Sequence, residues 1–166
     1  MSSLIRNCFL SIVSCIFVIT IAFSQEPCEH QPSDKVLKLL EKSKDRKNDS
    51  NDRTEAIEKA LEIDPECLPC LHQKGEMEFL RAKTGSLDFT ASKETFKNLI
   101  DLCPTYHPEP FYYLGAMCYA DREYDIALTY FDQFLRFESD DPKIMDKQYE
   151  KKYKDVEEAL PTVKAD

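Results

Sequence analysis

The most constraining feature of the chain is residues 108–137, where small and apolar residues recur at helical spacing on both sides of a polar break. In the first half they fall at i, i+3, i+4 and i+7, namely Phe111, Leu114, Gly115 and Cys118. After the break at Asp121–Glu123, Ala127, Phe131 and Leu135 fall at i, i+4 and i+8. Each half therefore predicts an amphipathic helix.

The short break predicts that the two helices form an antiparallel αα-hairpin. Gly115 and Ala127 are small enough to let the helices approach, and Phe131 is expected to fill the gap between them. Because one hairpin cannot bury its own apolar stripe, the rest of the chain must supply neighbours.

Composition limits what those neighbours can be. The chain has 166 residues, which is one domain's worth, and 32% of them are charged. Its three glycines leave little for phosphate-binding loops. The net charge of −9 argues against nucleic-acid binding and against binding to an acidic membrane surface, which would repel the chain.

Residues 1–24 predict a cleaved secretory signal. Arg6 precedes an apolar run from Cys8 to Phe23, and Ala22-Phe23-Ser24 offers small residues for cleavage after Ser24. The run is short for a membrane anchor. A lipoprotein signal at Cys15 is disfavoured because the apolar run continues past it. After cleavage, no direct membrane insertion is expected.

After a polar lead-in at 25–33, a first helical pair is predicted over 34–67. Its first helix carries an apolar stripe that includes Leu37 and Leu40, and a charged segment, 42–53, is interpreted as an exposed connection. The second helix then runs from Thr54 to Ile63 and is stopped by Asp64-Pro65.

A second pair is predicted over 68–107, with Leu71 and Gly75 in its first helix. Residues 82–90 are expected to form a long turn, and Ala91 to Leu102 a helix carrying Phe96 and Leu99. A third pair covers 108–141, followed by a helix at 143–160 and a tail at 161–166. The last helix has an apolar stripe on a charged background: Tyr149, Tyr153, Val156 and Leu160.

These patterns resemble the tetratricopeptide repeat (TPR), whose motif is aromatic-x2-Leu-Gly-x2-Tyr, then Ala-x3-Phe, then Pro. Residues 108–137 match it closely, with Cys118 in the Tyr position and no final Pro; EAIEKALEIDP resembles the end of a repeat. The resemblance covers residues 34–160. It implies an all-α fold, an αα-hairpin solenoid of about three TPR repeats plus a C-terminal capping helix.

The strings DPECLPCLHQKGE and YYLGAMCYADREYDIALTYFDQFL, with the DKQYEKKYKDVEEALP tail, resemble one TPR family in particular. They are similar to the N-terminal TPR segment of Bacteroidota outer-membrane-protein-A-family proteins. Those proteins add a WD40-like propeller and a peptidoglycan-binding domain, whose sequences do not follow here. The resemblance implies a periplasmic or outer-membrane-associated scaffold or assembly factor, with an outer-membrane or cell-wall-associated complex as its partner.

Cysteine and histidine residues are concentrated where the predicted pairs meet. In such a stack every first helix starts at the edge where the preceding second helix ends. That edge should hold four cysteines and all three histidines: Cys28, His30, Cys67, Cys70, His72, Cys103 and His107. Cys118 occupies an interior position and is expected to be a buried thiol.

Three interpretations of this edge compete. In an oxidising compartment, disulfides between adjacent loops are favoured, such as Cys28 with Cys67 or Cys70 and the other with Cys103. The second is a zinc site, drawn from Cys67, Cys70, His72, Cys103 and His107. The third is a redox Cys-x2-Cys motif, for which no βαβ setting is recognisable.

The second candidate surface is the concave groove that TPR geometry lines with first-helix residues. By register, nine residues line it: Lys35, Lys38, Lys42, His72, Glu76, Phe79, Glu109, Tyr112 and Tyr119. Aromatic side chains on such a face suit binding of another protein or peptide, although Tyr and Phe at these spacings also pack between repeats. No catalytic residues and no cofactor are expected, and the sequence predicts a non-enzymatic interaction module. The alternative is a thiol-redox or metal-binding protein that uses the Cys/His-rich edge.

Overall fold

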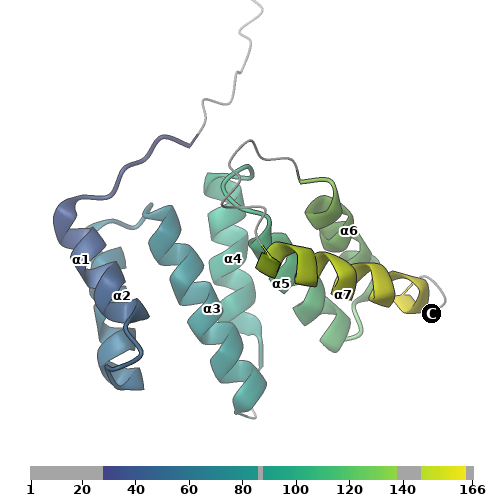
Figure 1. The fold of residues 1–166 in the computed structure, drawn as a ribbon, viewed down its shortest axis with the longest axis horizontal. Coiled ribbons are helices and arrows are strands. Elements are labelled where there is room, and N and C mark those ends of the chain that lie inside the picture. The colour runs from purple at the N-terminus through teal and green to yellow at the C-terminus, as the bar shows by residue number, and fades with distance from the viewer. Residues whose placement is uncertain (1–27, 86–87, 138–146, 164–166) are drawn as a thin grey trace, which may run out of the picture.

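The computed structural model describes residues 28–85, 88–137 and 147–163 (Figure 1). The predicted signal at 1–24, the first residues of the predicted last helix and the final residues of the tail lie outside them. In the described residues there are seven α-helices and no strand, which confirms the all-α prediction.

The first six helices form three consecutive pairs. The helices are α1 (Asp34–Lys44), α2 (Ser50–Ile63), α3 (Leu68–Thr84), α4 (Thr90–Leu102), α5 (Glu109–Ala120), α6 (Tyr124–Leu135) and α7 (Lys147–Val163). Each helix of a pair packs mainly on its partner, and neighbouring pairs meet through α2 with α3 and α4 with α5. The pairs therefore lie in a row, and α7 packs on α6 and α5 at the last one (Figure 1).

The predicted extent of the exposed connection, 42–53, is wrong, because α1 continues to Lys44 and α2 begins at Ser50. Asp49 explains the earlier start of α2: its carboxylate accepts hydrogen bonds from the N–H groups of Asn51 and Asp52, both at 2.8 Å. Such an N-cap satisfies N–H groups that have no partner within the helix.

The long turn predicted at 82–90 is also shorter than expected, because α3 continues to Thr84 and α4 begins at Thr90. Ala82 is buried, and the N–H of Gly85 donates to the carbonyl of Arg81. Burial of this small residue extends the helix past the position where composition alone suggests a turn.

Within the second pair and within the third pair, a glycine of the first helix contacts an aromatic ring of the second helix. A Cβ added at Gly115 would lie 2.5 Å from the ring of Phe131, and one added at Gly75 would lie 2.7 Å from the ring of Phe96. Each ring thus occupies the space that a larger residue would need. The expected roles of Gly115 and Phe131 are confirmed, and Ala127 is fully buried.

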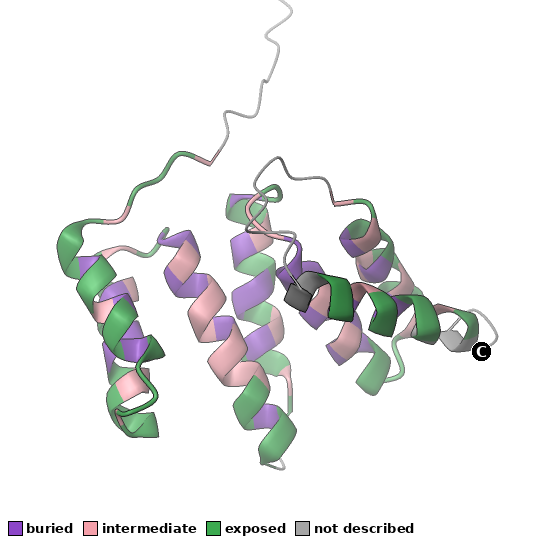
Figure 2. Ribbon diagram, viewed as in Figure 1, coloured by how far each residue is buried: buried purple, intermediate pink, exposed green. Residues whose placement is uncertain are grey.

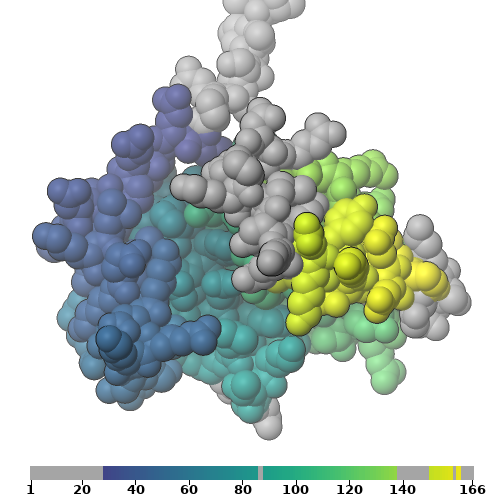
Figure 3. Space-filling view, viewed as in Figure 1, coloured from purple at the N-terminus to yellow at the C-terminus, as the bar shows by residue number. Residues whose placement is uncertain are grey.

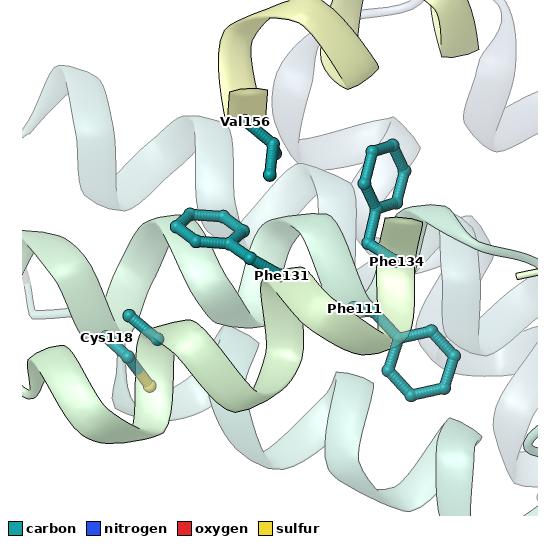
Figure 4. Close-up of a cluster of buried hydrophobic side chains, with 6 residues drawn as sticks. Phe111, Cys118, Phe131, Phe134 and Val156 are labelled. Carbon is teal, nitrogen blue, oxygen red and sulfur yellow. The ribbon is translucent and has the colours of Figure 1, made fainter. Parts of the chain in front are cut away.

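The apolar core along the row consists of clusters that differ in character. Around α5, α6 and α7 it is aromatic, with Phe111, Phe131 and Phe134 packed beside Val156 (Figure 4). Around α1 and α2 it is built from smaller residues, including Val36, Leu40 and Ile57. Leu37, expected in the stripe, is 40% exposed, because no described helix precedes α1 to cover it. Much of α1 is coloured as exposed in Figure 2.

Three of the four residues in the apolar stripe predicted for the last helix pack on the core; the side chain of Tyr149 lies outside the description. Val156 is 1% exposed, and Tyr153 and Leu160 pack against the same aromatic cluster. None of the helices in the described ranges combines the length and the apolar character needed to cross a bilayer.

Candidate functional site

The four cysteines proposed for disulfides lie in two bonded pairs, but not in the pairs expected. Cys28 is joined to Cys103, with Cα atoms 5.8 Å apart. The lead-in therefore extends past the start of α3 and reaches the loop between α4 and α5. The expectation that Cys28 pairs with Cys67 or Cys70 is wrong, because those two residues bond to each other.

Cys67 and Cys70 are bonded across the first turn of α3, with Cα atoms 5.2 Å apart. Residues three apart share a helix face, so the turn itself brings the two side chains together. Both residues are fully buried. Redox-active cysteines instead occupy accessible, electropositive surroundings.

Cys118 is a buried free thiol, as expected. Burial raises the pKa of Cys118 to about 11, and a hydrogen bond with Glu123 acts in the same direction. A thiol with so high a pKa is a poor nucleophile near neutral pH.

The three histidines separate into two groups on the edge where the pairs meet. His30 lies against Asp64, with Nε2 within 2.9 Å of both carboxylate oxygens. His72 and His107 lie together, with ring centroids 4.9 Å apart. Between them stands Glu109, whose Oε2 lies 3.1 Å from His72 Nε2 and 3.7 Å from His107 Nδ1.

Glu109 is a nearly buried carboxylate with cationic and imidazole neighbours. Its side chain is 10% exposed, and Lys152 of α7 donates a hydrogen bond to its Oε1. Burial alone would raise the pKa of Glu109, but His72 and Lys152 outweigh that effect and lower it to about 2. Glu109 is therefore ionised at neutral pH.

Lys152 is the member of this group that sequence reasoning missed. It is 8% exposed, and its Nζ lies 3.3 Å from the hydroxyl of Tyr113 and 4.7 Å from the centre of the Tyr113 ring. The hydroxyl of Tyr113 donates in turn to Glu76 at 2.9 Å. In the sequence, Lys152 is one lysine among several on a charged helix, so only packing of α7 on α5 distinguishes it.

The zinc set considered from the sequence is not assembled, because Cys67, Cys70 and Cys103 are held in disulfides. His72, His107 and Glu109 form a different group of metal-ligand type. Their donor atoms all lie within 4.8 Å of one another.

The predicted groove residues have unequal exposure. Lys38 is exposed on α1, and His72, Glu76 and Phe79 are half-buried along α3. Phe79 stacks on Phe89, with ring centres 5.7 Å apart, and contacts Tyr113 at 4.9 Å.

On α5 the predicted face is largely covered. Tyr112 is half-buried against the core, and Lys152 of α7 lies over its ring at 5.4 Å. Tyr119 is 37% exposed and contacts Tyr124, at the start of α6, with ring centres 5.7 Å apart. Of the two tyrosines, only Tyr119 thus remains at the surface.

A shallow cleft of about 390 Å³ lies between the start of α2 and the end of α3, and no pattern in the sequence predicted it. Leu80 in its wall is 57% exposed. The lining residues are Ser50, Arg53, Met77, Leu80, Arg81 and Thr84.

Comparison with protein-family models, with curated proteins and with solved structures finds no match for this chain.

Proposed function

We propose that the chain is a short TPR-type solenoid that binds another protein or peptide and has no catalytic activity. Three observations support the repeat assignment. The helices pair in chain order, the pairs lie in a row, and glycine–aromatic contacts recur at Gly75 with Phe96 and at Gly115 with Phe131. Helix α7 would then be the capping helix that a solenoid needs at its end.

The observation that carries the binding assignment is that the first helix of the third pair, α5, is covered by another helix, whereas the first helix of the first pair, α1, is not. Helix α7 lies against α5, whereas α1 presents Lys35, Lys38 and Lys42, all exposed. Within the described part of the chain, none of these three lysines forms an ion pair. Among the described helices, only α3 packs on the α1–α2 pair, which lies at the end of the row opposite α7 (Figure 3).

The partner would contact α1 and α3 together. The lysines of α1 provide positive charge, and Phe79 and Leu80 of α3 provide apolar surface beside the cleft of about 390 Å³. An extended segment carrying carboxylates and one or two apolar side chains fits such a combination, because interfaces combine apolar anchors with complementary charge. We place this function in the periplasm or at the outer membrane, on the basis of the predicted signal.

Site-specific photo-crosslinking in cells tests this proposal. A photoreactive residue at Lys38 or Phe79 should give a discrete crosslinked species. The matched control is Lys97, an exposed lysine on α4, which is the second helix of its pair. A photoreactive residue there should give no crosslinked species.

The double variant Lys35→Glu/Lys38→Glu should reduce the crosslink formed from Phe79 by about tenfold or more, the effect of losing one strong interface contact. Lys97→Glu should leave it unchanged. Equal crosslinking from Lys97, or an undiminished yield in the double variant with normal folding, would refute the proposed face.

A further inference from the structure

The side chains of His72, His107 and Glu109 come from three segments of the fold. His72 lies in the second turn of α3, His107 in the loop after α4, and Glu109 is the first residue of α5. Their donor atoms lie within 4.8 Å of one another, although His72 and Glu109 are far apart in sequence. From the structure we infer that these three residues bind a divalent transition-metal ion, for which Zn²⁺ is the natural probe.

The state of His72 points to a missing ligand. Within the described residues, its Nε2 is buried and has no hydrogen-bond partner. It lies 3.1 Å from Glu109 Oε2, close enough for an ion pair but without hydrogen-bond geometry. Buried polar atoms are nearly always satisfied, so an unsatisfied one calls for an ion or a water molecule.

The other two residues are prepared in the way that metal ligands are. Lys152 holds Oε1 of Glu109 and leaves Oε2 directed at the histidines. Ligating carboxylates are commonly oriented by such an outer hydrogen bond. His107 Nδ1 accepts the N–H of Glu109 at 3.2 Å, so this nitrogen is unprotonated, as a ligand must be.

Coordination through His107 Nδ1 would replace that one hydrogen bond. An ion about 2 Å from each donor requires donors about 3–4 Å apart, so small side-chain rotations would complete the site. Two imidazoles and a carboxylate suit Zn²⁺ and similar ions, whereas Ca²⁺ and Mg²⁺ prefer oxygen ligands. Three protein ligands leave at least one position open to solvent or to a ligand from elsewhere.

A bound ion would join the second and third helical pairs at their shared edge. Through Lys152, which contacts Glu109, it would also be linked to the docking of α7. The site makes no use of thiols, because both disulfides are intact and Cys118 is buried. This inference is independent of the proposed protein partner, since the ion can be measured without one.

Isothermal titration with Zn²⁺ tests the inference on the full chain, purified without a polyhistidine tag, stripped with EDTA and kept oxidised. We expect one Zn²⁺ per chain, and no comparable binding of Ca²⁺. His72→Ala and His107→Ala should each weaken Zn²⁺ binding by more than about 100-fold. Loss of a residue that only orients a ligand lowers metal affinity by about 10–100-fold, and loss of the ligand itself should lower it further.

His30→Ala is the matched control, since His30 is on the same edge but pairs with Asp64. It should bind Zn²⁺ as the wild type does, and circular dichroism should show all three variants folded. The inference would be overturned if the wild type bound no stoichiometric Zn²⁺, or if His72→Ala and His107→Ala bound Zn²⁺ as tightly as the wild type. Either result would show that the group is an ion-pair cluster only. Loss of binding in His30→Ala alone would place the ion elsewhere and overturn it as well.

Discussion

The two ends of the helical row are built differently. At the α5–α7 end, three phenylalanines form the core and α7 covers the first-helix face. At the α1–α2 end the core is smaller and aliphatic, and it includes the disulfide-bonded Cys67 and Cys70. Leu37 and Ile63 stay 40% and 44% exposed there.

This difference shows two ways of ending a row of helical pairs. One end is closed by an additional helix, which buries apolar surface. The other end presents charged residues to solvent and is fastened to the row by the covalent bond from Cys28 to Cys103. Among the described residues, no helix packs on the outer face of α1, and this is why the proposed partner is placed at that end.

The largest expected effect comes from the aromatic end. Phe131→Ala should lower the free energy of unfolding by about 3–5 kcal/mol, because it removes a buried ring packed on Gly115. Leu37→Ala at the other end should change it by less than about 0.5 kcal/mol, because that side chain is largely exposed. Urea denaturation measures both, and equal losses would contradict the proposed asymmetry of the core.

Next in size is the disulfide that fastens the lead-in. Cys28→Ser/Cys103→Ser should cost about 2–4 kcal/mol, because this bond closes a loop with a sequence separation of 75. Cys67→Ser/Cys70→Ser should cost about 1–2 kcal/mol, since its separation is 3. Thermal unfolding of the two double variants gives the comparison. If Cys67→Ser/Cys70→Ser lost more stability than the other double variant, then helix packing, and not loop closure, would account for most of the stabilisation by these disulfides.

A smaller effect is expected where helices approach through glycine. Gly115→Ala should cost about 1–3 kcal/mol despite the better helix propensity of alanine, because the added Cβ would overlap the ring of Phe131. Gly85→Ala is the control: it lies at the exposed end of α3, where the nearest atom to an added Cβ is 3.2 Å away. Its effect should stay within about 1 kcal/mol. Unchanged stability in Gly115→Ala would show that α5 and α6 can separate freely.

The smallest perturbation is chemical and leaves the sequence unchanged. The pKa of the Cys118 thiol is about 11, against an ordinary value of 9.0. This predicts alkylation by iodoacetamide about 100-fold slower at pH 8 than for an ordinary thiol. The sign follows from burial, which disfavours the thiolate, so reactivity should increase as the pH approaches 11. Mass spectrometry before and after denaturation in urea measures this, and rapid labelling of the native chain at pH 8 would refute it.

The sequence by itself determined the helices and the contacts within each pair. Apolar spacing located Phe111, Leu114, Phe131 and Val156 in the core, and small residues marked where helices approach. These predictions succeed because a side chain's position around a helix axis depends only on local periodicity. One exception was Leu37, which is exposed inside α1. The others were at helix ends, as at Asp49, where one capping side chain decides the boundary.

Only the tertiary structure decided which residues meet across the row. Nothing in the spacing distinguishes Cys103 from Cys67 as the partner of Cys28, because the choice depends on the path of the lead-in. Likewise, Lys152 is buried on Glu109 because of how α7 lies against α5. The sequence pattern placed His72 and His107 on one edge, but their grouping with Glu109 depends on how the second and third pairs pack.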